Sequence, residues 1–412
     1  MAYFYRDGKL MIGANSVTDP AVAVESVLPT PWRKPIYVYD LDDVERRYQA
    51  MNRALDGVKH TIHYAMKANS NPLLLGHFAQ LGAGVDTVSA GEITRALAAK
   101  VPPKKIIFSG VAKTKAEIEF ALTAGIKQIN VESTAELERI ASIARKLGLK
   151  ADVAFRLNPD VNPQTHPYIT TGFRENKFGM DESFLPQLFS ILKSEQQWLN
   201  PRGLTMHIGS LLFDLEVFRE AIEKTVAVHR RFQAHGFNLD RLDIGGGLGI
   251  RYETDDTTDE FAMIEAYGRM AREAVTSLGG EVELLTEPGR ILVGRSGLLV
   301  TEVQYTKATS AKLFAIVDSG MHHLLRPALY SAKHRVLPLS LPGTSSSHIY
   351  DVVGPICESS DFLAKDVRLG ELYQGSLLGI ADAGAYGFAM ASCYNSHELP
   401  DEIFVSDGRV IS

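Results

Sequence analysis

The sequence contains little cysteine, no long apolar run and no block of like charge. Only two of its 412 residues are cysteines, Cys357 and Cys393, too few for a disulfide framework or a cysteine-rich metal site. No apolar run approaches the roughly 20 residues that cross a bilayer. The first ten residues have neither the apolar core nor the small-residue cleavage site of a secretory signal. We therefore expect a cytoplasmic protein that does not bind a membrane.

The charge pattern argues against a nucleic-acid partner. A formal net charge of -6 comes without the basic stripe that contact with a phosphate backbone requires. Hydrophobic residues make up 45% of the chain and charged residues 22%, which are ordinary values for a globular protein. The partner is expected to be a small molecule.

The length and a repeating pattern indicate two domains. A single core stops growing at roughly 250 to 300 residues, and after a strand over residues 35–40 short apolar strands alternate with amphipathic helices as far as residue 290. Such alternating units predict a (β/α)8 barrel, with a doubly wound open sheet as the alternative. The predicted barrel strands cover residues 61–67, 85–89, 106–110, 129–133, 153–158, 204–210, 242–245 and 282–287. The clearest helices cover residues 134–147, 182–194, 214–235 and 259–277.

Beyond residue 290 the pattern changes to apolar strands separated by turns, which predicts a mostly antiparallel β domain. We expect a TIM-type barrel over residues 36–290, and a C-terminal β domain made of residues 1–35 and 291–412. The boundary near residue 290 lies beside candidate site residues, which suits a site between domains. The further strands are expected within residues 291–307, 314–318, 347–353, 376–381 and 402–405.

The unusual residues of the barrel region stand where its strands are expected to end. In such barrels the carboxyl ends of the strands carry the chemistry. Strand ends that were merely solvated would have no need of a lysine, a histidine, a glutamate and a run of glycines together. The residues are Lys67, Asp86, Ser89, Asn158, His207, Ser210, Gly245, Gly246, Gly247, Glu287, Gly289 and Arg290.

Lys67 follows a short apolar strand, so its amine must be solvated, paired or chemically used. It is either a surface lysine at a strand end or a desolvated amine that forms a Schiff base with a carbonyl cofactor. His207 is either a structural residue or one that stacks on a flat ring or shuttles a proton. Glu287 either forms an ion pair or holds a proton on a heteroaromatic nitrogen. No zinc-binding spacing is present, so we expect no metal.

The glycine run at residues 245–247 lets backbone amides approach an anion. A plain tight turn would have the same composition. Its place after the seventh strand, with Glu287-Pro288-Gly289-Arg290 after the eighth, favours a phosphate cradle, because barrels often bind phosphate there.

A series of segments, in order over nearly the whole chain, resembles the signature motifs of diaminopimelate decarboxylases, which belong to the alanine-racemase-like, fold type III group of pyridoxal-phosphate enzymes. The resemblance implies a barrel followed by a β domain, pyridoxal 5'-phosphate as cofactor, and a homodimer with shared active sites. The segments are Tyr64-Ala65-Met66-Lys67-Ala68-Asn69, Thr165-His166-Pro167 through Thr171-Gly172, Asn176-Lys177-Phe178-Gly179, His207-Ile208-Gly209-Ser210, Gly245-Gly246-Gly247, Glu287-Pro288-Gly289-Arg290, Arg326-Pro327-Ala328-Leu329-Tyr330, Gly354-Pro355-Ile356-Cys357-Glu358-Ser359-Ser360-Asp361 and Asp382-Ala383-Gly384-Ala385-Tyr386-Gly387.

The same resemblance implies roles in cofactor binding. Lys67 would hold the cofactor covalently, Glu287 would face its pyridine nitrogen, and His207 would stack on its ring. Asp86 also belongs to the implied cofactor site. The phosphate would be bound by Ser210, by the backbone amides of Gly246, Gly247, Gly289 and Arg290, and by the hydroxyl of Tyr386.

The resemblance also implies that a second set of residues binds the substrate. Arg290, Arg326 and Tyr330 would bind the distal carboxylate of the substrate, whose planar shape suits a guanidinium, and Tyr386 would also contact the substrate. Glu358 would bind the distal amine. Cys357 would be the acid that reprotonates the α-carbon, and it would arrive with Glu358 from the partner subunit.

The chain departs from the family pattern at positions that carry no proposed chemical role. Leu211 stands where glutamine is usual, Ala90 replaces a glycine, and His322-His323 stands where Asn-Asp is common. Gly375-Ser376 replaces Gly-Asp, and Cys393 replaces an asparagine. Decarboxylation is therefore expected, while Leu211 and the histidine pair leave the exact substrate open.

The main hypothesis is decarboxylation of meso-2,6-diaminopimelate to L-lysine and carbon dioxide, the last step of bacterial lysine biosynthesis. The alternatives are a related decarboxylase acting on ornithine, lysine, arginine or a carboxylated polyamine, a racemase, and a non-catalytic binding homologue. Arg290 with Arg326 favours a substrate that has a distal carboxylate. Residues 162–180, with His166 and Lys177, are a candidate lid on length alone.

Overall fold

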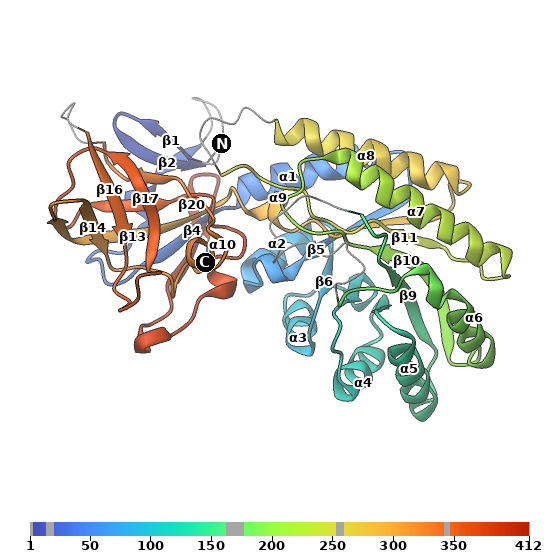
Figure 1. Ribbon diagram of the computed structural model, residues 1–412. Coiled ribbons are helices and arrows are strands. Elements are labelled where there is room, and N and C mark those ends of the chain that lie inside the picture. Colours follow the sequence, from blue (N-terminus) through green and yellow to red (C-terminus); the bar gives the residue numbers. More distant parts are fainter. Residues whose placement is uncertain (1–2, 14–19, 162–176, 253–258, 342–346, 412) are drawn as a thin grey trace. The chain divides into compact units, whose positions relative to one another are not determined.

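The computed structural model describes residues 3–13, 20–161, 177–252, 259–341 and 347–411 (Figure 1). The chain divides into two compact units. We call residues 49–249 and 259–289 the barrel unit, and residues 1–48, 250–258 and 290–412 the β unit. Most of the candidate lid lies outside the described residues.

The barrel unit contains a closed barrel of eight parallel strands in the order β10-β11-β12-β5-β6-β7-β8-β9. Its last strand pairs with its first, with Leu284 opposite His60 and Thr286 opposite Ile62. Closure confirms the predicted TIM-type barrel and rules out the open sheet. The strands are β5 (His60–Ala65), β6 (Gly84–Thr87), β7 (Ile106–Phe108), β8 (Gln128–Val131), β9 (Ala151–Leu157), β10 (Leu199–Met206), β11 (Arg241–Asp243) and β12 (Glu283–Thr286).

Helices surround these strands (Figure 1). Side-chain caps fix where several of them begin: Ser89 and Ser133 accept hydrogen bonds from the third backbone N–H of α3 and α5, and Thr114 with Glu117 forms a full capping box on α4. Such caps satisfy N–H groups that the helix itself leaves unpaired. The helices are α1 (Leu41–Ala54), α2 (Pro72–Gln80), α3 (Ala90–Ala98), α4 (Lys115–Ala124), α5 (Thr134–Leu147), α6 (Leu185–Ser194), α7 (Leu215–Ala234) and α8 (Glu260–Ser277).

The β unit contains a mostly antiparallel nine-stranded sheet and a three-stranded sheet. The predicted strand over residues 35–40 is β4 (Ile36–Asp40), and it pairs with β13 and β19 in the larger sheet. The other strands are β1 (Tyr3–Arg6), β2 (Lys9–Gly13), β3 (Ala21–Ala23), β13 (Gly297–Ala308), β14 (Leu313–Val317), β15 (Val336–Pro338), β16 (His348–Val353), β17 (Phe362–Leu369), β18 (Leu377–Ile380), β19 (Asp401–Ser406) and β20 (Arg409–Ile411).

One core joins the two ends of the chain within the β unit. Leu10 and Ile12 pack in the same buried cluster as Val38, Leu298 and Val405. The predicted long strand over residues 291–307 is wrong at its start, because residues 290–293 form a short helix, α9 (Arg290–Val293), before β13 begins. This turn of helix buries the Arg290 side chain, which is 6% exposed. A second short helix, α10 (Arg326–Tyr330), follows β14.

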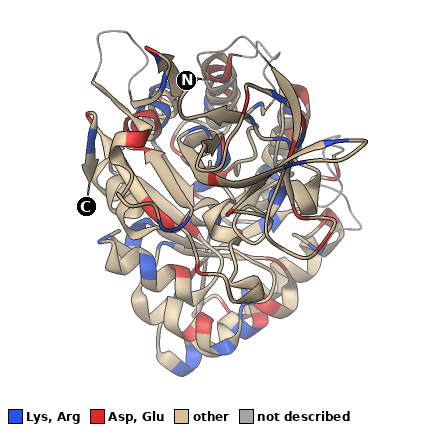
Figure 2. Ribbon diagram, turned by 90° about the vertical axis from the view of Figure 1, so that its left-hand side faces the viewer, with Lys and Arg blue, Asp and Glu red and all other residues tan. Residues whose placement is uncertain are grey.

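Charged side chains of both signs are interspersed along the helices (Figure 2). Within the residues that the structure describes, no helix is both long enough and apolar enough to cross a membrane.

Two helical glycines of the barrel unit predict that an added methyl group has opposite effects on stability at the two positions. A Cβ at Gly268 in α8 would lie 2.3 Å from the carbonyl oxygen of Ala54, whereas a Cβ at Gly76 in α2 would meet no atom within 4 Å. We expect Gly268→Ala to lower the free energy of unfolding by about 1–3 kcal/mol through overpacking. The matched control Gly76→Ala should raise it by about 0.5–1 kcal/mol, because alanine has less backbone freedom to lose. Urea unfolding followed by circular dichroism measures both, and equal effects would contradict the close approach of α8 to Ala54.

Candidate functional site

Lys67 lies directly beyond β5, in a single 3-10 turn over Met66–Ala68. Met66 and Ala68 are buried, whereas the lysine is exposed, so the desolvated amine that the sequence suggested is not found. The chain turns here because Asn69 accepts a hydrogen bond from the backbone of Asn71 (2.9 Å), which in turn caps α2. The amine is therefore held at the carboxyl end of the barrel and is accessible to a ligand.

Three carboxyl groups gather at the same end of the barrel. Asp86 is the last but one residue of β6, Asp243 ends β11 and Glu287 follows β12. They are 2%, 0% and 8% exposed. Burial raises the pKa of all three: Asp243 reaches about 7, and Glu287, which also faces the other two carboxylates, lies well above its ordinary value. Asp243 and Glu287 each act on the pKa of the other, so the two carboxyl groups lie close together.

Two oxygen atoms of this cluster have no hydrogen-bond donor in the part of the chain that the structure describes. The oxygens Oδ1 of Asp86 and Oδ2 of Asp243 are buried without a hydrogen-bond partner among the described residues. The charge of Lys67 lowers the pKa of both Asp86 and Glu287, which shows that the amine is close enough to act on them. A buried carboxylate without a partner is costly, so a protonated ring nitrogen placed here would be stabilised.

His207 follows β10 and is half-buried. Its Nδ1 accepts a hydrogen bond from the backbone N–H of Gly246 at 3.4 Å, so the neutral ring carries its proton on Nε2. Burial, and then the charges of Lys67 and Arg156, hold the pKa of His207 well below 6.5. The imidazole is therefore an uncharged flat ring at the barrel end.

The glycine run after β11 cannot carry side chains. A Cβ at Gly246 would lie 2.1 Å from the carbonyl oxygen of Glu287, and one at Gly247 would lie 2.4 Å from that of Gly209. Gly247 also has a φ of 112°, which L-residues rarely adopt. Glycine is therefore required here for the backbone to pack this closely.

A second cluster lies within the β unit, around Tyr252. Arg326, the first residue of α10, is 1% exposed, and its guanidinium lies 4.5 Å from the centre of the Tyr252 ring. Arg290 donates a hydrogen bond from Nη1 to the Tyr252 hydroxyl (2.8 Å), and its guanidinium lies 4.6 Å from the ring of Tyr386. Tyr330 acts electrostatically on Arg326. Four predicted residues, Arg290, Arg326, Tyr330 and Tyr386, are thus brought together.

Arg326 has no carboxylate partner among the described residues. Its Nε atom is buried without a hydrogen-bond partner in the part of the chain that the structure describes. Burial, together with the nearby charge of Arg290, lowers the pKa of Arg326. A carboxylate from a ligand would relieve this cost, and a guanidinium binds a carboxylate in a planar, two-point geometry.

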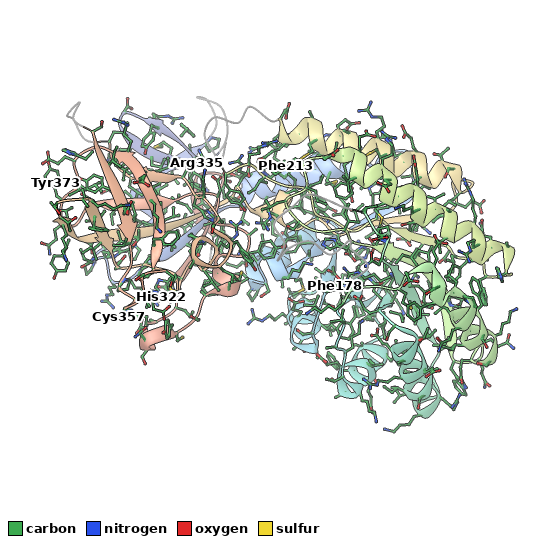
Figure 3. All side chains as sticks on the ribbon, in the orientation of Figure 1. Phe178, Phe213, His322, Arg335, Cys357 and Tyr373 are labelled. Atoms are coloured by element: carbon green, nitrogen blue, oxygen red, sulfur yellow. The ribbon has the colours of Figure 1, made fainter. Side chains whose placement is uncertain are left out.

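Cys357 and Glu358 belong to neither cluster. They lie on the exposed segment between β16 and β17 (Figure 3). Glu358 accepts hydrogen bonds from the hydroxyls of Tyr394 and Ser360. Asp361 organises the segment, because its carboxylate accepts hydrogen bonds from the backbone N–H groups of Met321 and Ile356, both at 2.6 Å. The thiol and the carboxylate are therefore presented outward on a braced loop.

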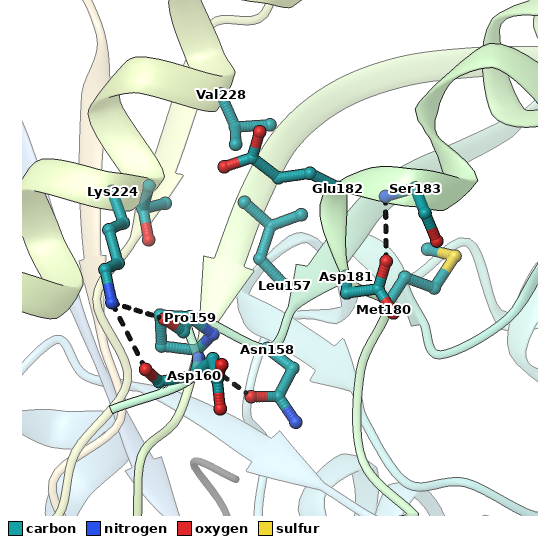
Figure 4. Close-up of a pocket in the computed structure, with 11 residues that line it drawn as sticks. Leu157, Asn158, Pro159, Asp160, Met180, Asp181, Glu182, Ser183, Lys224 and Val228 are labelled. Atoms are coloured by element: carbon teal, nitrogen blue, oxygen red, sulfur yellow. Dashed lines mark hydrogen bonds between the residues drawn. The ribbon is translucent and has the colours of Figure 1, made fainter. Parts of the chain in front are cut away.

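A cavity of about 540 Å³ opens beside the carboxyl end of β9. Figure 4 shows Lys224 of α7 reaching across it to the carbonyl oxygens of Pro159 and Asp160, at 3.0 and 3.2 Å. Asn158 and Met180 line this cavity, but none of the residues with an implied role in binding the cofactor or the substrate does. The candidate residues described above form separate groups: the barrel-end cluster, the arginine cluster and the Cys357 segment.

Three residues at these clusters were missed by the sequence analysis. Asp243 ends β11, and its place at the carboxyl end of a barrel strand was the available signal. Asn130, within β8, donates to Glu287 at 3.4 Å, and Tyr252 joins the two arginines; neither lies in a segment that resembles a known motif.

Residues 41–294 match the protein family described as "Pyridoxal-dependent decarboxylase, pyridoxal binding domain". This chain belongs to that family. It is a carboxy-lyase, and its cofactor is pyridoxal 5'-phosphate.

Two curated relatives that match nearly the whole chain have the same name. The chain is 43% identical over 407 residues to a protein of Pseudomonas aeruginosa named diaminopimelate decarboxylase, covering 99% of this chain and 94% of that protein. The relative of that name from Aquifex aeolicus is 39% identical over 406 residues, with coverages of 98% and 93%.

Solved structures of two decarboxylases are similar to this chain over most of its length. Diaminopimelate decarboxylase from Helicobacter pylori complexed with L-lysine superposes with a TM-score of 0.86 at 42% identity, covering 92% of this chain and 94% of that chain. Lysine decarboxylase from Selenomonas ruminantium superposes with a TM-score of 0.80 at 26% identity, with coverages of 92% and 94%.

The carboxylate cluster predicts a pH-dependent stabilisation by Asp243→Asn. The pKa of Asp243 is raised from 3.8 to about 7, so the folded protein binds more protons than the unfolded chain between these values. Its stability therefore falls as pH rises through this window. The asparagine carries no such penalty and keeps an oxygen for the N–H of Gly245, which Asp243 binds at 2.8 Å. We expect cofactor-free Asp243→Asn to gain roughly 2 kcal/mol more at pH 8 than at pH 5.

Denaturant unfolding at both pH values measures this effect. The matched control is Asp56→Asn, at an exposed aspartate outside the cluster. A gain that is the same at pH 5 and pH 8 would show that Asp243 is not a strained carboxylate.

Proposed function

We propose that this protein decarboxylates meso-2,6-diaminopimelate to L-lysine and carbon dioxide, the last step of bacterial lysine biosynthesis. The observation that carries the proposal is the Arg326 guanidinium, which is buried, stacked on Tyr252 and without a carboxylate partner among the described residues. Diaminopimelate has a second carboxylate, which this guanidinium suits. The names of the relatives, and the L-lysine bound in two related structures, support the same substrate.

The barrel-end cluster supplies groups that fit the cofactor. When bound, the cofactor accepts the electrons left on the α-carbon as carbon dioxide departs. Lys67 offers an accessible amine for the covalent link to the cofactor aldehyde. Glu287, with Asp86 and Asp243 beside it, favours a positive charge at the pyridine nitrogen, and His207 offers a neutral flat ring. The phosphate is assigned to Ser210, to the backbone amides of Gly246, Gly247, Gly289 and Arg290, and to the hydroxyl of Tyr386.

The β unit supplies the groups that recognise substrate and return a proton. Arg290, Arg326 and Tyr330 bind the distal carboxylate, and Tyr386 contacts the substrate. Glu358 binds the distal amine, and Cys357 delivers a proton to the α-carbon. We assign Cys357 and Glu358 to the site of a partner subunit in a homodimer, because both are exposed on a braced segment.

We place the reaction in the cytoplasm, since both cysteines are free thiols and disulfides are rare in that compartment.

A substrate panel tests the reaction. The holoenzyme should release carbon dioxide from meso-diaminopimelate at least about a hundredfold faster, as kcat/KM, than from L-lysine, L-ornithine or L-arginine. A site built around a group that the analogue lacks can discriminate by that much or more. Carbon dioxide capture and chromatography of the amino acid measure the rates. Faster release from L-lysine would favour the reaction of the Selenomonas relative, and no release from any substrate would favour a binding homologue.

Mixing of inactive subunits tests the shared site. Lys67→Ala and Cys357→Ala should each lose about a hundredfold or more in kcat, because one removes the covalent link and the other a general acid. In a mixed dimer, one of the two sites takes an intact Lys67 from the Cys357→Ala subunit and an intact Cys357 from the Lys67→Ala subunit. The other site has lost both residues. Co-refolding equal amounts should therefore restore roughly a quarter of wild-type activity if the subunits pair at random.

Two controls accompany the mixture. Lys67→Ala mixed with Glu287→Gln should restore nothing, because both changes lie in the barrel unit and leave no dimer with an intact site. Cys393→Ala, at the other exposed cysteine, should keep its activity. Failure of the first mixture to recover, with dimers present by light scattering, would assign Cys357 to its own subunit.

A further inference from the structure

The buried guanidinium of Arg326 is held by a histidine that no motif indicates. His334 lies in the segment between α10 and β15 and is 5% exposed. Its Nε2 lies 2.8 Å from Nη1 of Arg326, and its Nδ1 lies 2.9 Å from the carbonyl oxygen of Ala381.

These two contacts fix the tautomer of the ring. A carbonyl oxygen can only accept, so Nδ1 of His334 carries a proton and donates it to Ala381. Arg326 can only donate, so Nε2 carries a lone pair and accepts. Protonation would put two cations in contact. Burial and the charge of Arg326 accordingly lower the pKa of His334 to about 3, and the imidazole is a neutral acceptor at any pH at which the enzyme is assayed.

Tyr252 completes the support of Arg326. The guanidinium lies over the face of the Tyr252 ring, and the His334 ring meets the same tyrosine edge-on, with ring centres 5.0 Å apart and planes 69° apart. The hydroxyl of Tyr252 accepts the hydrogen bond from Arg290. One tyrosine therefore orients both arginines, while the histidine fixes the direction of one N–H edge of Arg326.

We propose that His334 is a positioning residue that, with Tyr252 as a platform, presets the guanidinium of Arg326 for the distal carboxylate of the substrate and so determines the preference for dicarboxylic substrates. The inference rests on the proposed function for the assignment of Arg326 to that carboxylate. A guanidinium held in its binding orientation loses less freedom when the ligand arrives, which increases affinity.

The experiment compares two ligands that differ in one group. L-lysine keeps the distal carboxylate of the substrate, and cadaverine is L-lysine without it. Calorimetric titration of the holoenzyme gives both dissociation constants. We expect His334→Phe, which keeps a ring against Tyr252 but has no acceptor, to weaken L-lysine binding roughly tenfold to a hundredfold, the value of a hydrogen bond to a charged group. Cadaverine binding should change less than about twofold.

Two further variants separate positioning from folding. His334→Gln places an amide oxygen within reach of Arg326 and should recover L-lysine binding to within about threefold of wild type. The asparagine side chain of His334→Asn can still bind Ala381 but is too short to reach Arg326. This variant should therefore weaken L-lysine binding as His334→Phe does, and it replaces His334→Phe if that variant does not fold. In turnover, the loss should appear in KM for diaminopimelate more than in kcat.

Thr301→Val and Arg326→Lys serve as controls. Thr301 is buried in the β unit and hydrogen-bonded to Asp318 at 2.6 Å, so its loss lowers stability without touching Arg326 and should leave the ratio of the two dissociation constants unchanged. Arg326→Lys should weaken L-lysine selectively. If it does not, the assignment of Arg326 in the proposed function is wrong. If it does but His334→Phe and His334→Asn both bind L-lysine as wild type does, the role of His334 is refuted and the proposed function stands.

Discussion

The parallel pairing of β12 with β5 is the contact on which the barrel-end cluster depends. It closes the barrel between residues more than 200 positions apart, with Thr286 opposite Ile62, and continues past the strands as a hydrogen bond from the N–H of Ala65 to the carbonyl of Pro288 at 3.1 Å. Lys67 and Glu287 each lie just beyond this pairing, so the lysine and the carboxylate come to the same rim because the first and last strands are neighbours. A slip of one residue by either strand would turn the side chains of that strand to the other face of the sheet.

Both ligand clusters are electrostatically incomplete, and in opposite senses. At the barrel end three buried carboxyl groups include two oxygens with no hydrogen-bond partner among the described residues, and burial raises their pKa values. Around Tyr252 a buried guanidinium has no carboxylate partner in the described part of the chain, and its pKa is lowered. Unpaired buried charge lowers stability, so a fold retains it where a ligand completes it. The first cluster suits a cationic ring, and the second suits an anion.

The sequence predicted the barrel and many of its site residues for one physical reason. Strand and helix periodicities differ, and a barrel brings the ends of its parallel strands to one rim, so Lys67, Asp86, His207 and Glu287 could be grouped without any contact being known. Asp243 was missed because its role depends on its closeness to Glu287, which follows the next strand and on whose pKa it acts. The sequence left Lys67 open between a surface lysine and a desolvated amine, because a strand end does not reveal which way the following 3-10 turn points; in the structure the lysine is exposed.

The arginine cluster was harder to read from sequence. Arg290, Arg326 and Tyr386 were found by their likeness to family segments, whereas Tyr252 and His334 lie in none of those segments. Tyr252 follows the glycine run by five residues and yet belongs to the β unit, so no strand-end rule applies to it. His334 sits in a connection between α10 and β15, where a histidine is usually an ordinary polar residue. Only the two ring-nitrogen contacts, to Ala381 and to Arg326, show its role.

The identity of the group that holds Arg326 bears on how the enzyme selects its substrate. A carboxylate in place of His334 would fix the guanidinium equally well, but it would also neutralise the charge and weaken the attraction for a substrate carboxylate. A neutral imidazole supplies the geometry of an acceptor and leaves the charge uncompensated. A substrate with a distal carboxylate then gains the full interaction, whereas a diamine leaves a desolvated cation unpaired in the complex. Discrimination of this kind depends on the binding free energy that the wrong ligand loses as much as on the free energy that the right ligand gains. The wrong ligand loses it only while the partner of Arg326 within the protein, His334, is uncharged.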